Sequence, residues 1–182
     1  CTPQTLLNDS PAAWGGYAPR NFDGRFRGDI RASLALAESR NLPAIDLLAR
    51  LGTPRVTDLL ASLGLKSLSP GERDIGLSLA TGGAEASPLE LAAAYACLAR
   101  GGTYRPVKII ASADSQEQYS STKPLISKAS CGDVLRALAA PDRTRAISPQ
   151  AARLGVAWKT GTSSRNRDAI CAAVSVSHTV VV

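Results

Sequence analysis

Two short polar runs contain residue types that could do chemistry, and they lie about 120 positions apart. Residues 159–163 read Lys-Thr-Gly-Thr-Ser and belong to a β-prone stretch. The lysine would supply a cation for a substrate carboxylate, and the hydroxyls would supply hydrogen bonds. Because glycine has no side chain, a substrate backbone could approach the strand closely there. Residues 39–41 read Ser-Arg-Asn before Pro43, where an ordinary helix-ending turn is the alternative interpretation.

Other nucleophilic and metal chemistries have weaker signals. His178 is the only histidine and lies in a Val-rich stretch, without a serine elbow elsewhere, so we predict a surface strand residue rather than the base of a triad. This favours chemistry in which a lysine serves as the base. The four cysteines (Cys1, Cys97, Cys131 and Cys171) lack metal-ligand spacing, so neither a metal nor a cofactor is predicted. Cys97 and Cys171 are expected to be small buried hydrophobes.

Composition excludes several classes of protein. The 182 residues carry 21 Lys and Arg against 15 Asp and Glu, a net charge of +6, and 45% are hydrophobic, which excludes a disordered chain. The longest apolar run, residues 91–99, is too short to cross a bilayer. Nucleic-acid binding is disfavoured because acidic residues interrupt the basic ones over residues 20–31 and aromatics are only 4%. A weak attraction to anionic polymers remains compatible with the charge.

The chain divides into three parts that would have to position the two polar runs. Residues 1–30 are rich in turn formers and are predicted to be an extended connector. Residues 31–150 are predicted to be mainly helical, with one strand over residues 104–111. Residues 151–182 are predicted to form the strand with Lys-Thr-Gly and the sheet strands that follow. Helices before strands indicate an α+β fold with an antiparallel sheet.

Two of the predicted helices have explicit boundary signals. Thr53 is a candidate N-cap before Pro54, and Gly64 is a candidate stop. The sequence Ser-Pro-Leu-Glu at residues 87–90 forms a capping box with proline at the first helical position, and a glycine pair at residues 101–102 ends that helix. Further helices are expected over residues 31–40, 43–51 and 128–140.

Several collinear segments together identify a family. They are residues 21–28 (Asn-Phe-Asp-Gly-Arg-Phe-Arg-Gly), 39–44 (Ser-Arg-Asn-Leu-Pro-Ala), 76–83, 87–92 and 158–169. With them the chain resembles the transpeptidase domain of class A penicillin-binding proteins, most closely those of the 1C type. The resemblance covers almost the whole chain and implies a helical lobe joined to an antiparallel sheet. Arg165, in a turn where the family usually has glycine nearby, and Ile170, where tryptophan is usual, depart from the pattern.

The resemblance implies a reaction and a role for each candidate residue. A serine would attack a D-Ala-D-Ala stem peptide to form an acyl-enzyme, and an amine of a second stem peptide would take the acyl group and cross-link peptidoglycan. Ser39 would relay a proton to the leaving amine, and Asn41 would bind a substrate amide. Lys159 would supply positive potential. Substrate contacts would come from Thr160, Gly161 and Thr162, with the Thr162 N–H as half of the oxyanion hole.

The serine nucleophile is the missing part of the pattern. The family carries it in a Ser-x-x-Lys-Pro phrase upstream of Ser39, where nothing in this sequence fits. Residues 120–124 match that phrase, but Ser120 lies between the other two motifs in a polar stretch. We therefore expect the chain to be a transpeptidase domain incomplete on its N-terminal side, inactive alone, and completed by an N-terminal segment that carries the serine.

The resemblance also implies partners and a location. Stem peptides and β-lactams are the expected ligands, and nucleic acid is not. The parent protein is expected to carry a glycosyltransferase domain and to be anchored at the periplasmic face of the bacterial inner membrane. Two alternatives stay open: a serine β-lactamase or D,D-carboxypeptidase of the same fold, and a non-catalytic scaffold or sensor that retains the fold.

Overall fold

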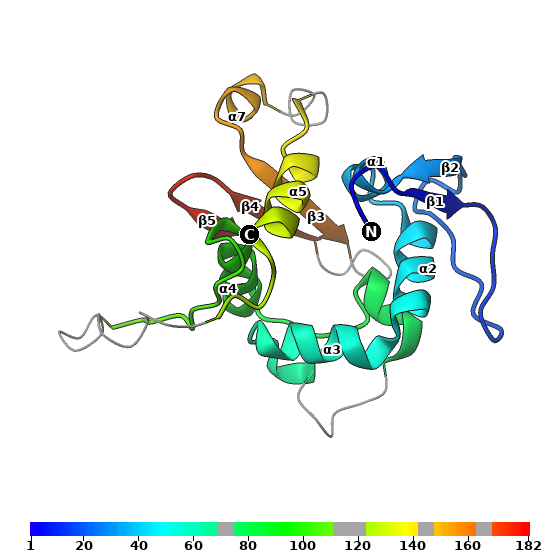
Figure 1. The fold of residues 1–182 in the computed structure, drawn as a ribbon, viewed down its shortest axis with the longest axis horizontal. Helices are drawn as coiled ribbons and strands as arrows, with labels where there is room; N and C mark the ends of the chain where they lie inside the picture. The colour runs from blue at the N-terminus through cyan, green and yellow to red at the C-terminus, as the bar shows by residue number, and fades with distance from the viewer. Residues whose placement is uncertain (69–74, 111–122, 142–147, 163–168) are drawn as a thin grey trace.

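A computed structural model describes residues 1–68, 75–110, 123–141, 148–162 and 169–182. The chain combines helices with two antiparallel sheets, as predicted (Figure 1). Its elements are β1 (Leu6–Asp9), β2 (Gly28–Arg31), α1 (Ala32–Ala37), α2 (Asn41–Leu51), α3 (Thr53–Ser62), the 3₁₀ turns η1 (Lys66–Leu68) and η2 (Gly76–Thr81), α4 (Pro88–Ala99), α5 (Lys128–Leu138), α7 (Pro149–Arg153), β3 (Ala157–Thr162), β4 (Ala169–Val174) and β5 (Thr179–Val181).

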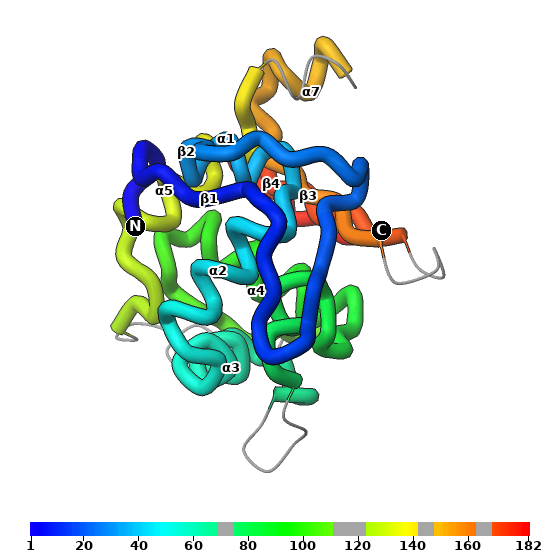
Figure 2. The backbone as a smooth tube through the Cα atoms, turned by 90° about the vertical axis from the view of Figure 1, so that its right-hand side faces the viewer, coloured from blue at the N-terminus to red at the C-terminus, as the bar shows by residue number. Residues whose placement is uncertain are grey.

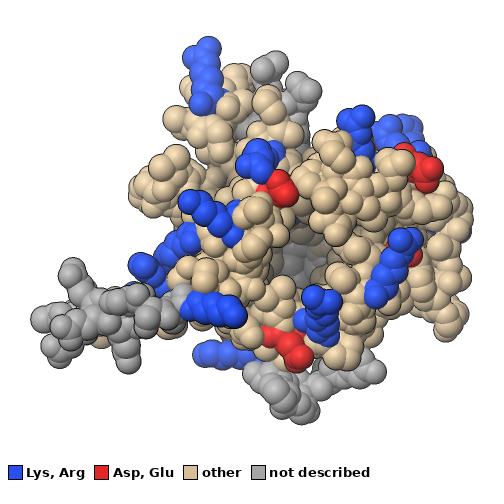
Figure 3. Space-filling model, viewed as in Figure 1, with Lys and Arg blue, Asp and Glu red and all other residues tan. Residues whose placement is uncertain are grey.

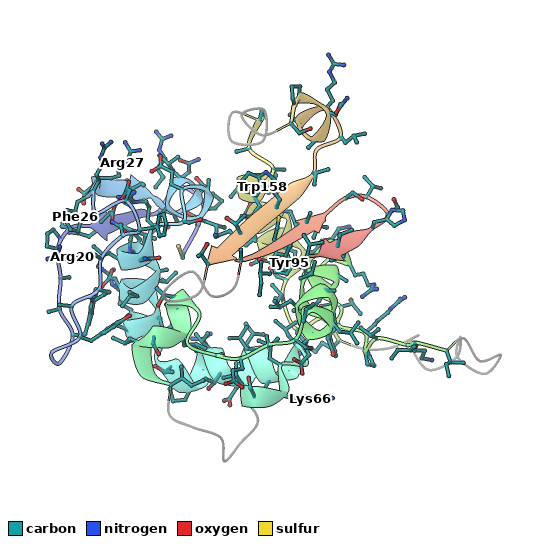
Figure 4. All side chains as sticks on the ribbon, turned by 180° about the vertical axis from the view of Figure 1, so that it is seen from behind. Arg20, Phe26, Arg27, Lys66, Tyr95 and Trp158 are labelled. Carbon is teal, nitrogen blue, oxygen red and sulfur yellow. The ribbon has the colours of Figure 1, made fainter. Side chains whose placement is uncertain are left out.

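The larger sheet has the strand order β3-β4-β5, with both neighbouring pairs antiparallel. Helices α4 and α5 contact it, α4 at β4 and β5, and α5 at β3. One buried cluster of Leu138, Ala157 and Val174 joins α5 to the sheet, and Tyr95 of α4 packs against it. Figure 4 shows Tyr95 and Trp158 at this part of the molecule. The sheet that carries the Lys-Thr-Gly strand is therefore held by packing against both helices.

The first thirty residues form more structure than the predicted connector. β1 and β2 pair antiparallel, from Leu6 opposite Arg31 to Asp9 opposite Gly28, so strands and not helices come first in the chain. The N-terminal arm (residues 10–27) joins the two strands as a long loop that lies beside α2 (Figures 1 and 2). Local turn signals within the arm were correct, but the pairing of its two ends was missed because it joins residues 19 to 25 positions apart in the sequence.

Helix α4 is closed at both ends, as the sequence predicts. Ser87 accepts a hydrogen bond from the Glu90 N–H, and the Glu90 carboxylate accepts one from the Ser87 N–H at 2.8 Å. At the other end, the Gly102 N–H donates to the Cys97 carbonyl and the Gly101 N–H to the Leu98 carbonyl, which is a Schellman motif. The Gly102 carbonyl in turn accepts from the Leu125 N–H at 2.9 Å. The chain thus returns to the end of α4 before it enters α5.

Two local predictions were wrong. No strand forms in the described part of residues 104–111, where Val107, Ile109 and Ile110 are exposed rather than paired in a sheet. β-prone residues form a strand only where a partner strand meets them. At the start of α3, Gly52 and not Thr53 is the N-cap, and Thr53 is already helical.

Two absences bear on function. Within the described ranges, none of the helices combines the length and the apolar character that a bilayer span requires. The same part of the chain holds no group of three His, Cys, Asp or Glu side chains arranged for a metal ion.

Candidate active site

Ser39 lies in the turn between α1 and α2, in an uncommon backbone conformation. Its φ is +57°, and it is the only non-glycine residue with positive φ in the described part of the chain. The Ser39 N–H donates to the Leu36 carbonyl and the Arg40 N–H to the Ala35 carbonyl, so Ser39 occupies the Schellman position that usually belongs to glycine. Its side chain is exposed. A hydroxyl is thus held on the surface at a strained position, which is a pattern that functional sites often show.

Arg40, the middle residue of the Ser-x-Asn motif, is buried and fully engaged. Its side chain is only 4% exposed. The Nε group donates to Asp9 at 2.8 Å and Nη1 donates to Asp23 at 2.9 Å. The Nη2 group donates to the Arg25 carbonyl. The guanidinium therefore reaches β1 and two points of the N-terminal arm from the turn that holds Ser39.

Asn21 joins the same network from the arm. Its amide nitrogen donates to Asp9 at 2.6 Å and to the Arg25 carbonyl at 2.8 Å. Its amide oxygen accepts from the Asn41 N–H at 2.8 Å. The Asn41 side chain donates to the Arg20 carbonyl at 2.9 Å. The first turn of α2, where four N–H groups lack helical partners, is thus capped by the arm.

The charges of this network are balanced by its contacts. Burial alone would lower the pKa of Arg40, but the hydrogen bonds that it donates to Asp23 and Asp9 outweigh burial and raise that pKa. The pKa of Asp23 is lowered, first by the hydrogen bond from the Arg25 N–H and then by the one from Arg40. The stability that Asp23 contributes is therefore present above the ordinary carboxyl pKa and is lost as pH falls through the lowered value.

The second motif lies along the C-terminal half of β3. Thr160, Gly161 and Thr162 are exposed, and Lys159 is half-buried with its ammonium group 2.6 Å from the Thr160 carbonyl. A Cβ atom added at Gly161 would meet nothing within 4 Å, and its φ is not positive. Neither packing nor backbone conformation therefore requires glycine at this position.

The turn that carries the first motif and the end of the strand that carries the second lie near each other in the fold. The end of β3 is directed toward the α1–α2 turn in Figure 1, and the two lie near each other in Figure 2 as well. Figure 3 shows the molecular face hollowed between the α2 side and the side of α4 and α5, with Lys and Arg side chains spread around it.

The remaining candidates lie elsewhere or carry no activated group. Ser120 is outside the described residues. In Figure 1 the segment that follows α4 extends to the left, and α2 lies on the right. His178 is exposed, as predicted, although it lies in the turn between β4 and β5 rather than in a strand.

The cysteines behave largely as small buried hydrophobes. Cys97 and Cys131 are buried, and Cys171 is half-buried on β4. Burial raises the pKa of both the Cys97 and the Cys131 thiols, so they stay protonated at neutral pH. Neither thiol is therefore an activated nucleophile.

Sequence reasoning did not assign any role to four residues of this site: Asp9, Asn21, Asp23 and Arg40. A signal was present for three of them, since Arg40 stands inside the Ser-x-Asn motif and the other two belong to the recognised segment over residues 21–28. Asp9 gave none, because its partner lies 31 positions away in the sequence.

Comparison with known proteins identifies the family. The penicillin binding protein transpeptidase domain matches residues 1–170. The chain belongs to this family. Penicillin-binding protein 1C of Escherichia coli (strain K12) is 36% identical over 180 residues, which are 98% of this chain and 22% of that protein. Penicillin-binding protein 1F of Bacillus subtilis (strain 168) is 38% identical over 104 residues, 56% of this chain. The transpeptidase domain described here thus spans about a fifth of its 1C relative.

Solved structures support the fold. The penicillin-binding protein PonA1 from Mycobacterium tuberculosis superimposes on 99% of this chain with a TM-score of 0.78 at 20% identity, over 54% of the PonA1 chain. Penicillin-binding protein 1A from Haemophilus influenzae gives a TM-score of 0.73 at 21% identity, over 34% of that chain. A second PonA1 structure contains penicillin V and has a TM-score of 0.76 with this domain. The penicillin-binding transpeptidase fold predicted from the sequence is confirmed.

Proposed function

We propose that this chain is part of a peptidoglycan D,D-transpeptidase that works through a serine acyl-enzyme. The observation that carries the proposal is that the α1–α2 turn and the end of β3, which hold the two motifs, lie near each other in a chain that belongs to the transpeptidase family. Ser39 relays the proton to the leaving amine and Asn41 binds the substrate amide. Lys159 and the two threonine hydroxyls hold the terminal carboxylate, and the Thr162 N–H forms half of the oxyanion hole.

The chemistry around the hollow fits an anionic substrate. A stem peptide ends in a carboxylate, and Lys and Arg exceed Asp and Glu by six in this chain. Positive potential at a cleft raises the local concentration of anions. We further propose that the whole protein acts on stem peptides, binds β-lactams as PonA1 binds penicillin V, and carries out its reaction at the periplasmic face of the inner membrane, to which it is anchored beside a glycosyltransferase domain.

The serine nucleophile is proposed to lie outside these 182 residues. Ser120 is the only serine in a Ser-x-x-Lys phrase, and it stands between the other two motifs in a polar stretch of the sequence. The other half of the oxyanion hole, which the nucleophile's own N–H supplies, is proposed to come with that serine.

Covalent labelling by fluorescent penicillin should differ between the 182-residue chain and the whole protein. We expect no covalent labelling of the 182-residue chain and stoichiometric labelling of the protein as its gene encodes it, measured by gel fluorescence and peptide mass spectrometry. Labelling of the chain at Ser120 would contradict the placement of the nucleophile. A whole protein that binds peptidoglycan without being labelled would support a scaffold instead, and one that hydrolyses penicillin rapidly would support a β-lactamase.

Gly161→Ala is expected to raise the stability of the protein and to lower its activity. Because the position is open, the methyl group should raise the free energy of unfolding by about 0.5–1 kcal/mol through lower chain entropy in the unfolded state. The same methyl group would displace a substrate lying along β3, and a shift of about 1 Å can cost roughly 100-fold in rate. Penicillin acylation of the whole protein and urea unfolding would measure the two effects.

Gly132→Ala is the matched control for this prediction. Gly132 lies within α5, where an added Cβ would meet only the flexible end of Arg136. It should stabilise the protein similarly and leave acylation unchanged. An unchanged acylation rate in Gly161→Ala would contradict the proposal that substrate lies along β3.

A further inference from the structure

We propose that Arg40 is a positioning residue for the Ser-x-Asn turn and that Asp9 and Asp23 hold its guanidinium in place. The inference rests on the proposed function in one respect: the turn is taken to carry catalytic Ser39 and substrate-binding Asn41. It goes further because it assigns a role to the middle residue of the motif and to carboxylates on a strand and an arm that the reaction itself does not use.

Every nitrogen of the Arg40 guanidinium has a hydrogen-bond acceptor. Its three nitrogens donate to three acceptors from different places: Asp9 on β1, Asp23 on the arm, and the Arg25 carbonyl. Only a planar group with donors in fixed directions can satisfy all three at once, so a lysine at position 40 could not replace it. With three points of attachment, the guanidinium can neither translate nor rotate without breaking a charge-assisted bond.

The N-terminal arm contacts Asn41 as well as Arg40. Asn21 holds the Asn41 N–H, and the Arg20 carbonyl holds the Asn41 side chain. Arg40 lies between the two motif residues. Its partner Asp23 belongs to the arm, and its partner Asp9 also accepts hydrogen bonds from Asn21 and from the Arg27 N–H of the arm. The arm therefore fixes Arg40 and Asn41, the two residues that follow Ser39. Figure 4 shows Arg20, Phe26 and Arg27 grouped on this side of the molecule.

The backbone conformation of Ser39 has to be stabilised by its surroundings. Ser39 has a left-handed backbone, a conformation that is strained for a residue other than glycine. A strained residue persists only where its surroundings determine it. The hydrogen bonds of Arg40 and Asn41, on the residues that immediately follow Ser39, supply that determination.

Asp23→Asn is the decisive variant, because Asp23 is the exposed member of the network. Its side chain is 44% exposed, so the protein should still fold, whereas Arg40 and Asp9 are buried. The matched control is Asp133→Asn, a carboxylate of similar exposure (38%) that pairs with Arg136 within α5 and takes no part in the Arg40 network. Asp23→Glu, which keeps the charge, tests rescue.

The experiment uses the whole protein and two measurements. The first is the rate constant for acylation by fluorescent penicillin. We expect it to fall about tenfold in Asp23→Asn, the loss expected for one charge-assisted hydrogen bond, and to recover at least partly in Asp23→Glu. The second is amide hydrogen exchange by peptide mass spectrometry. Exchange over residues 39–42 should rise about tenfold, while residues 157–162 should not change. Asp133→Asn should alter neither quantity.

The outcomes distinguish this inference from the proposed function. Unchanged exchange over residues 39–42, or an equal rise in β3, would contradict the positioning role, because the second result means general loss of stability. Increased local exchange with an unchanged acylation rate would also overturn it. If the unmodified protein is not labelled by penicillin at all, the proposed function fails, and the exchange data alone then decide whether Arg40 and Asp23 hold the turn.

Discussion

Replacing Asp9 by alanine is expected to lower the free energy of unfolding by about 3–5 kcal/mol. The variant would leave the Arg40 guanidinium buried with one carboxylate partner, and that partner, Asp23, is 44% exposed. It would also leave an Asn21 amide proton and the Arg27 N–H without their acceptor. A buried charge that loses one of its two carboxylate partners is costly because the protein interior solvates it poorly.

Urea unfolding followed by circular dichroism measures this prediction directly. Asp29→Ala is the control, since Asp29 is exposed on the neighbouring strand β2; its effect should stay within about 0.5 kcal/mol, as is usual for surface substitutions. A loss below about 1 kcal/mol in Asp9→Ala would mean that water enters the network and screens Arg40. That result would also weaken the case for a rigid turn.

Gly102→Ala is expected to cost about 3 kcal/mol or more. Two effects add at this position. The residue has φ +96°, where any side chain is strained, and a Cβ atom would collide with the backbone carbonyl of Ile126. A backbone atom cannot rotate away as a side chain could. Either the Schellman end of α4 or the return of the chain through Leu125 would have to shift.

Gly155→Ala separates these two effects. Gly155 also has a positive φ, +63°, but an added Cβ there would meet nothing within 4 Å. It should therefore show only the conformational cost of about 1–2 kcal/mol. Comparable losses of melting temperature in the two variants would show that the chain near Ile126 adjusts easily. A clearly larger loss in Gly102→Ala, by calorimetry or urea unfolding, would confirm that the return is rigid.

The features predicted from the sequence are those with local causes. The capping box at Ser87 and the glycines after α4 are short-range signals, and both ends of that helix were placed correctly. An antiparallel sheet in the C-terminal part was also expected from its β-prone stretches, and β3, β4 and β5 form one. The prediction of a strand at residues 104–111 was wrong. These residues are also β-prone, but their described part pairs with no other strand.

The candidate site divides in the same way. Ser39, Asn41 and residues 159–162 stand in short motifs whose residue types signal chemistry. Arg40 and Asp9 do not, since a buried arginine cannot be told from an exposed one until the chain brings its carboxylates to it. The network joins residues up to 31 positions apart, and such contacts depend on how β1, the arm and α2 come together. Pattern alone therefore finds the groups proposed to meet substrate and misses those that support them.

The left-handed backbone of Ser39 has a consequence for the evolution of such domains. Glycine would relieve the strain at this position and complete an ordinary helix-ending turn. Selection for thermal stability alone would therefore favour glycine at residue 39, while selection for the proposed proton relay would keep the serine hydroxyl. A descendant that has lost catalysis but keeps the fold as a scaffold should drift to glycine or asparagine at this residue before its core changes. The residue at position 39 would then distinguish working enzymes from their inactive relatives.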